Sequence, residues 1–218
     1  MSEYPYVVSL DPWIDLEAIP TLDALMVDAL TAFHADTERR SPLSVDHEPT
    51  RVHRLHLARR KAWARPGPIG RSIFHDFANP ELWEPRRRRQ QEFAPLMEFI
   101  DRLPFTHTAR ILIAYSFEGH GTPLHSDHLD DDLIQEFIWL RTNPTKRFYV
   151  CNQSGEVADK RYVESHAAWF DTCGLYQRHA SDDVEGLSFS VRIDGVFTPQ
   201  LRRMIHETTA RARERLER

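Results

Sequence analysis

After Pro104 the chain breaks into short runs rich in β-branched, aromatic and aliphatic residues, and turn residues separate these runs. Short strands at this spacing, with no helical stretch between them, favour an antiparallel sandwich or barrel over alternating βαβ units. The second half of the chain is therefore predicted to be a β core. Its expected strands lie at 109–117, 135–140, 147–151, 167–171 and 187–193.

The first hundred residues show helical periodicity instead. Thr21 is the expected cap of a first helix, because apolar residues recur at helical spacing from Leu22 to Phe33. A second helix is expected within 86–103, where Pro95 should kink it or start a new one. The basic segment 51–63 has no clear strand face.

A last helix should begin at Pro199, with Thr198 as its cap. Together these patterns predict an α+β, mainly β protein with a single domain. Its parts are a largely helical region at 1–105, a β core at 106–197 and a C-terminal helix at 198–218. The N-terminal region could cover the mouth of the β core or form a homodimer contact.

The composition argues against several classes of protein. Among the 218 residues no run approaches the roughly 20 consecutive apolar residues that a membrane-spanning helix needs. The first residues lack the pattern of a signal peptide, and the two cysteines, Cys151 and Cys173, are too few for a disulfide framework. We therefore expect a cytoplasmic protein without a membrane partner.

Charge is distributed unevenly along the chain. The net charge of −5 argues against a nucleic-acid partner. Nevertheless, 51–71 holds seven Lys and Arg residues and no acid, 86–89 is four arginines, and 127–136 holds five acids and no Lys or Arg. Such runs are usually solvated faces, although folding could bring basic and acidic segments to one mouth.

His125-Ser126-Asp127 follows the first expected strand and a Gly/Pro turn. Residues i and i+2 of an extended segment point to the same side, so one imidazole nitrogen and one carboxylate oxygen can bind one ion. A third ligand from a distant strand would complete the facial triad of two histidines and one carboxylate, which leaves open positions on iron(II). Downstream candidates for this ligand are His128, His166, His179 and His206.

The ordered set of His125-x-Asp127, then His179 52 residues later and Arg192 13 residues beyond it, resembles the iron(II)/2-oxoglutarate-dependent dioxygenases. The resemblance covers roughly 109–197 and implies a double-stranded β-helix, or jelly roll. It implies iron(II), 2-oxoglutarate and O2 as cofactors, with the metal held by His125, Asp127 and His179. It also implies that Arg192 pairs with the far carboxylate of 2-oxoglutarate.

Arg192 also has a physical rationale, because a guanidinium fork matches a carboxylate bidentately. The alternative is an ion pair with Asp194 within the sheet. Many relatives carry serine or threonine two residues after this arginine, where this chain has Asp194. Ser190 or Tyr115 is therefore expected to supply the second contact to the co-substrate.

The size of the chain and its 137–140 and 147–150 segments resemble small bacterial hydroxylases of free amino acids, which are related to the radical halogenases. Those halogenases lack the carboxylate that Asp127 provides, so hydroxylation or desaturation is expected, with succinate and CO2 as by-products. The expected substrate is a small polar metabolite, and in particular a free amino acid. Its candidate contacts are Glu118, Asp130, Asp131 and Asp132 for an ammonium group, Arg71, Arg110 and His120 for a carboxylate, and Trp139.

Other functions stay open on sequence alone. A peptide or protein hydroxylase of the same superfamily would need an open groove. A nucleic-acid demethylase is disfavoured, because no second arginine follows Arg192 closely. Outside the superfamily, the β half could be a cupin-like isomerase or binding barrel with a structural metal, or the chain could be a non-catalytic interaction protein.

Overall fold

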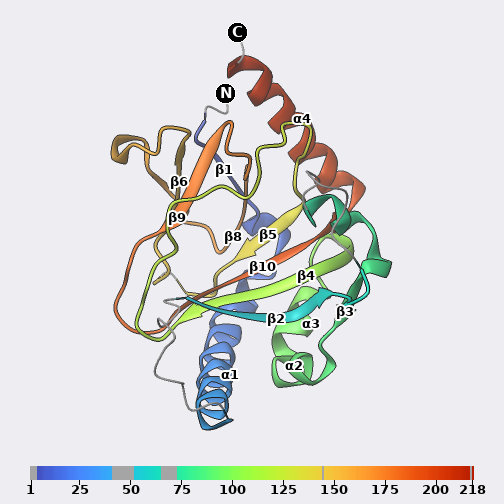
Figure 1. The fold of residues 1–218 in the computed structure, drawn as a ribbon, viewed down its shortest axis with the longest axis vertical. Coiled ribbons are helices and arrows are strands. Elements are labelled where there is room, and N and C mark those ends of the chain that lie inside the picture. Colours follow the sequence, from blue (N-terminus) through green and yellow to red (C-terminus); the bar gives the residue numbers. More distant parts are fainter. Residues whose placement is uncertain (1–3, 41–51, 65–72, 144, 217) are drawn as a thin grey trace.

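This computed structural model describes residues 4–40, 52–64, 73–143, 145–216 and 218, and its strands form two antiparallel sheets (Figure 1). In spatial order, the larger sheet contains β1 (Val7–Ser9), β8 (Ala167–Phe170), β5 (Phe137–Leu140), β10 (Ser188–Phe197), β4 (Phe105–Ser116), β2 (His53–Arg60) and β3 (Trp83–Pro85). The smaller sheet contains β7 (Arg161–Tyr162), β6 (Phe148–Asn152) and β9 (Gln177–Ser181).

The two sheets pack face to face as a double-stranded β-helix. From β4 onward the chain alternates between them, and a bridge between His125 and His179 adds the His125 segment to the smaller sheet. Phe148 of the smaller sheet lies with its ring centroid 4.6 Å from Trp139 and 4.9 Å from Phe170 of the larger sheet. The predicted jelly-roll core with flanking helices is therefore confirmed.

Helices cover the outer face of the larger sheet (Figure 1). They are α1 (Ile19–Arg40), α2 (Arg87–Glu92) and α3 (Ala94–Ile100). Leucine and isoleucine side chains from α1 and α3 share one apolar core with Ile111, Ile113 and Val191 of the sheet. That face of β4 and β10 is sealed, so any site on these strands must lie on the inner face.

The C-terminal helix α4 (Pro199–Leu216) begins at the predicted proline and buries Leu201 and Ile205. Short 3-10 helices lie at Asp11–Trp13, Leu16–Ala18, Ile73–Ala78, Pro80–Leu82 and Val157–Asp159. No described helix is long and apolar enough to cross a membrane. The break expected near Pro95 is present, because α3 starts at Ala94 after a separate α2.

The prediction of a largely helical region at 1–105 was incomplete. Strands β1, β2 and β3 from this region extend both edges of the larger sheet, so residue 105 divides no structural units. The ambiguous segment 51–63 contains β2, which gains its conformation by pairing with β4. Two bounds also differ: α1 starts at Ile19, before the expected cap at Thr21, and β4 starts at Phe105.

Candidate metal centre

His125 and His179 are brought together by backbone pairing. Each donates its amide N–H to the carbonyl of the other, at 3.0 Å from His125 and 2.9 Å from His179. This antiparallel bridge sets the two imidazole centroids 4.1 Å apart. The choice of His179 among the downstream histidines is thus made by strand register, which a single sequence does not contain.

Asp127 completes the group. Its amide donates to the carbonyl of Thr172 at 3.0 Å, which ties the segment to the chain after β8. Its Oδ1 lies 3.8 Å from Nε2 of His125 and 3.7 Å from Nε2 of His179. Two ligands that each lie about 2.1 Å from one ion are at most about 4.2 Å apart, so this spacing fits a shared ion.

The protonation states also suit a metal. Nδ1 of His125 lies 2.7 Å from the carbonyl oxygen of Pro123, which assigns the proton to Nδ1 and leaves Nε2 as a ligand. Burial lowers the pKa of His179 to about 3, so its imidazole is neutral. Burial alone would raise the pKa of Asp127, but Arg192 and the two histidines hold it below its ordinary range. Neutral imidazoles and an ionised carboxylate are the forms that bind metal.

Arg192 lies directly against the metal-site carboxylate. Its Nη1 donates to Oδ2 of Asp127 at 2.5 Å, its Nε donates to Oδ1 of Asp194 at 2.9 Å, and its Nη2 contacts Oε1 of Gln135. The guanidinium also lies 4.1 Å from the ring centroid of Phe137. Both the pairing with Asp194 and the proximity to the triad are therefore present.

The two predicted hydroxyl contacts have different positions. Ser190 is buried and lies on the same face of β10 as Arg192. Tyr115 lies on the opposite face of β4, where its ring stacks on His53 at 5.0 Å and contacts His34 of α1. The expectation that Tyr115 contacts the co-substrate is wrong, because side chains alternate between faces and residue 115 belongs to the helix-covered face.

The predicted substrate contacts lie in different parts of the structure. Trp139 is the register partner of Arg192 and lies inside the sandwich. Glu118 and His120 pair with each other at 2.8 Å on the turn after β4. Asp130 pairs with Nε2 of His75 at 2.7 Å. Neither pair includes a residue of the triad. Arg71 lies outside the described residues.

Asp131 and Asp132 form with Asp130 a second group of clustered carboxylates, which are partly or fully exposed. The carbonyl of Asp131, and not its carboxylate, makes the buried contact, because it accepts from Nη1 of Arg213. His128 points away from the triad, as expected, and its Nδ1 accepts from the amide of Asp130 at 3.2 Å.

The contacts around Arg192 were only partly predicted from the sequence, which named Asp194 as a possible partner of Arg192 and Arg110 as a possible substrate contact. Asp194 is completely buried and accepts from Nε of Arg110 at 2.8 Å as well as from Arg192. Gln135 supplies the third partner of Arg192. The alternation of Arg192 and Asp194 along one strand was a usable signal for Asp194. Arg110 of β4, expected to contact a substrate carboxylate, pairs with Asp194 instead. Gln135 lies just before β5 and was not identified, because no local pattern marks it.

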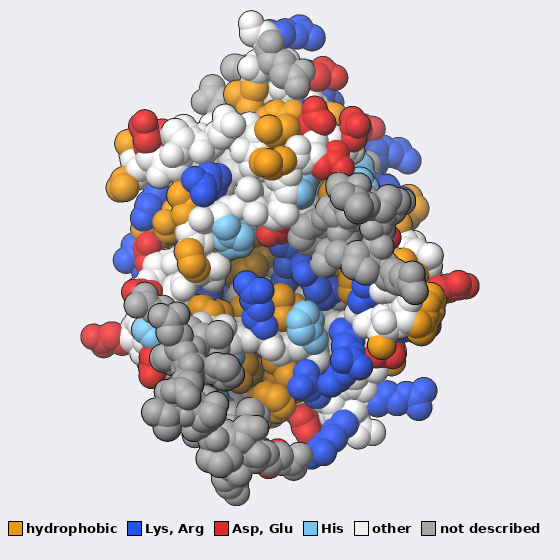
Figure 2. Space-filling model, in the orientation of Figure 1, with side chains coloured by type: hydrophobic (Ala, Val, Ile, Leu, Met, Phe, Trp, Pro, Cys, Tyr) orange, Lys and Arg blue, Asp and Glu red, His pale blue; other side chains and the backbone are white. Residues whose placement is uncertain are grey.

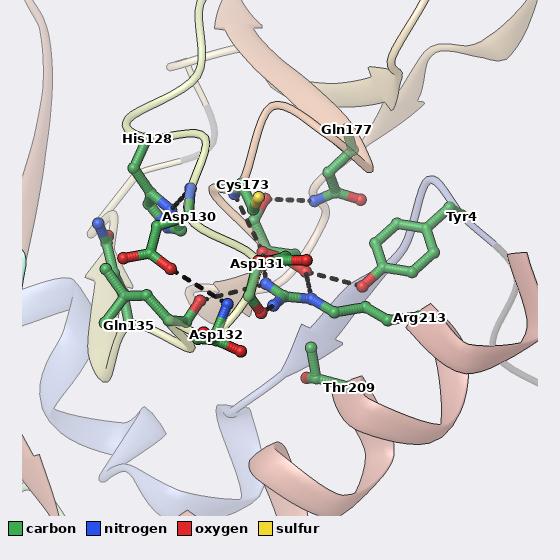
Figure 3. Close-up of polar contacts among 12 residues, drawn as sticks. Tyr4, His128, Asp130, Asp131, Asp132, Gln135, Cys173, Gln177, Thr209 and Arg213 are labelled. Atoms are coloured by element: carbon green, nitrogen blue, oxygen red, sulfur yellow. Dashed lines mark hydrogen bonds and ion pairs between the residues drawn. The ribbon is translucent and has the colours of Figure 1, made fainter. Parts of the chain in front are cut away.

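A buried ion pair braces the loop beside the triad. Nη2 and Nε of Arg213 donate to the two oxygens of Asp171 at 2.7 and 2.8 Å, and the hydroxyl of Tyr4 donates to Oδ2 at 2.7 Å. Figure 3 shows Tyr4 and Arg213 converging from the N-terminal segment and from α4. Asp171 precedes Thr172, whose carbonyl holds the amide of Asp127, so both ends of the chain support the candidate metal centre.

No protein-family model matches the sequence, and no curated protein matches it. Among solved structures, a prolyl-4-hydroxylase from Pseudomonas putida has 12% sequence identity and a TM-score of 0.41, covering 86% of this chain and 90% of that chain. An oxidoreductase of the 2OG-Fe(II) oxygenase family from Burkholderia pseudomallei has 14% identity and a TM-score of 0.40, covering 86% and 82%. At identities and scores this low, the chemistry of this chain rests on its own geometry.

Proposed function

We propose that this protein is an iron(II)- and 2-oxoglutarate-dependent dioxygenase that hydroxylates an unactivated C–H bond of a small polar metabolite, a free amino acid. The observation that carries this proposal is the convergence of Nε2 of His125, Nε2 of His179 and Oδ1 of Asp127, with Arg192 beside them. Two histidines and one carboxylate are the ligand set typical of non-haem iron(II) oxygenases.

The residues present fit the implied metal. His125, Asp127 and His179 would hold iron(II), which together with 2-oxoglutarate and O2 supplies the oxidising chemistry, with succinate and CO2 as by-products. The backbone bridge between the histidines sets the spacing of their rings, and Pro123 selects the tautomer of His125. The protein thus contributes the ligand geometry, with His179 buried and Asp127 and His125 partly exposed.

Arg192 is expected to change partner when the site is filled. When the carboxylate of Asp127 binds a divalent ion, its ion pair with Arg192 becomes weaker. Arg192 would then be available for a carboxylate of 2-oxoglutarate, while Asp194 and Gln135 keep the guanidinium oriented. Ser190, on the same face of β10, would donate a hydrogen bond from its hydroxyl to the same co-substrate.

The first experiment is an anaerobic titration of the metal-free protein with iron(II) and then 2-oxoglutarate, followed by visible absorption. A chelated keto acid should give a charge-transfer band, which should be lost in His179→Ala and weakened in Arg192→Ala. Well-folded, iron-loaded protein without a band would contradict the proposal and favour a cupin-like barrel with a structural metal.

The substrate class needs its own assay. Each free amino acid is added to the iron-loaded enzyme with 2-oxoglutarate and O2, and succinate formation is measured. At least one amino acid should raise succinate formation severalfold above the uncoupled rate. If the charge-transfer band forms but no amino acid stimulates turnover, the cofactor assignment stands and the amino-acid assignment fails.

A further inference from the structure

The inner face of β2, two strands away from β10 in the larger sheet, is basic. Leu55 and Leu57 of β2 are buried in the helix-covered core, so the alternate side chains of Arg54 and His56 point to the inner face of the sheet. Strand pairing places His56, Leu112 and Arg192 in one row across β2, β4 and β10. Strands lie about 4.8 Å apart, so His56 is roughly 10 Å from Arg192 along this row.

The two carboxylates that contact Arg192 already have partners. Asp194 is shared by Arg110 and Arg192, and Asp127 is a candidate metal ligand. Arg54 makes no ion pair with a described residue. Figure 2 shows the result as a hollow in the centre of this face where Lys, Arg and His side chains gather over β2, β4 and β10.

One ring nitrogen of His56 lacks a hydrogen-bond partner among the described residues. This nitrogen, Nδ1, is buried. Burial and the nearby guanidinium groups of Arg110, Arg89, Arg54 and Arg86 lower the pKa of His56. An unpaired buried polar atom costs roughly 1–3 kcal/mol, so an N–H of His56 surrounded by arginines is well suited to meet an anion.

We propose that Arg54 and His56 bind a carboxylate of the substrate and thereby select an acid whose reacting carbon lies toward the triad. This inference rests on the proposed function. Arg54 makes no ion pair with a described residue and Nδ1 of His56 makes no hydrogen bond with one, so a carboxylate of the substrate would supply a partner to both.

The test measures binding without turnover. Protein loaded with manganese(II) and 2-oxoglutarate under nitrogen is titrated with the twenty amino acids, with short-chain carboxylic acids and with the matching primary amides, and the shift in melting temperature is recorded. At least one acid should bind at least tenfold more tightly than its amide. Arg54→Gln and His56→Asn should each weaken the binding of that acid at least tenfold and leave the affinity for 2-oxoglutarate unchanged.

Arg59→Gln is the matched control, because Arg59 lies on the same strand but pairs with Glu84 at 3.0 Å on the surface. It should bind the acid as the unaltered protein does. Equal binding of acid and amide, no shift with any acid, or full affinity in Arg54→Gln would each overturn the inference. Normal iron and 2-oxoglutarate binding in the same samples would show that the proposed function survives that failure.

Discussion

Arg192 donates to Oδ2 of Asp127 while Oδ1 of the same carboxylate faces the two candidate histidine ligands. The carboxylate is therefore oriented before any ion binds, with Oδ1 directed toward the two histidines. Ligands held in place by neighbouring hydrogen bonds bind metals more tightly, because less conformational freedom is lost on binding.

Loss of one triad ligand should weaken iron(II) binding at least about a hundredfold. Even the loss of a residue that only hydrogen-bonds to a metal ligand lowers metal affinity by roughly 10- to 100-fold. His179→Ala and Asp127→Gly are the variants, measured by anaerobic iron(II) titration. Asp127→Gly should also lose most turnover. His166→Gln is the control, since its Nδ1 contacts only the carbonyl of Arg141. Unchanged iron affinity in His179→Ala would remove His179 from the centre.

Substitution of Arg192 should separate iron binding from 2-oxoglutarate binding. Hydrogen bonds to charged groups contribute about 1.5–3 kcal/mol, so Arg192→Met should lower the affinity for 2-oxoglutarate by roughly 10- to 100-fold. Arg192→Lys should be intermediate, because it keeps the charge and loses the fork. The measurement is the charge-transfer titration in iron-saturated protein. Equal 2-oxoglutarate affinity in all three proteins would assign Arg192 to orienting Asp127 alone.

Arg213→Met should destabilise the fold by about 3–5 kcal/mol, because it leaves the buried carboxylate of Asp171 without its cation. The free energy of unfolding is measured in urea. Arg211→Met, at an exposed position of the same helix, should stay within about 0.5 kcal/mol. Because Asp171 precedes the carbonyl that holds Asp127, Arg213→Met should also bind iron more weakly. A variant with normal stability would show that the ion pair makes no net contribution.

Lys146 is predicted to make stability depend on pH. It is buried, its Nζ has no hydrogen-bond partner among the described residues, and burial lowers its pKa to about 8. Between about pH 8 and pH 10.4 the unfolded chain holds this proton and the folded chain releases it, so stability from this group rises with pH. Below about pH 8 the full penalty applies, roughly 3 kcal/mol at 1.36 kcal/mol per pH unit.

Lys146→Met should therefore be more stable than the unaltered protein at pH 7, and the difference should shrink by about 2 kcal/mol at pH 9.5. Urea unfolding at both pH values measures this, and Lys61→Met controls for the loss of one positive charge. Parallel pH profiles for the unaltered protein and Lys146→Met would show that Lys146 does not titrate in this range.

Local patterns in the sequence were sufficient to predict many of the helices and strands. The strand runs after Pro104, the helix that begins at Pro199 and the break near Pro95 depend on neighbouring residues, and each was predicted near its place. The short strands β1, β3, β7 and β9 were not, because they gain their conformation from partners far along the chain. Tyr115 shows the same limit, since its inward or outward direction depends on which face of β4 the helices cover.

For the candidate site, the sequence by itself determined that His125 and Asp127 share a side, because two residues of an extended segment do so without any partner. Only the tertiary structure decided that His179 joins them, through a backbone bridge across 54 positions of the chain. It also decided that Arg54 and His56 lie on the same face of the sheet as Arg192, because strand register between β2, β4 and β10 is set by packing of the whole sheet.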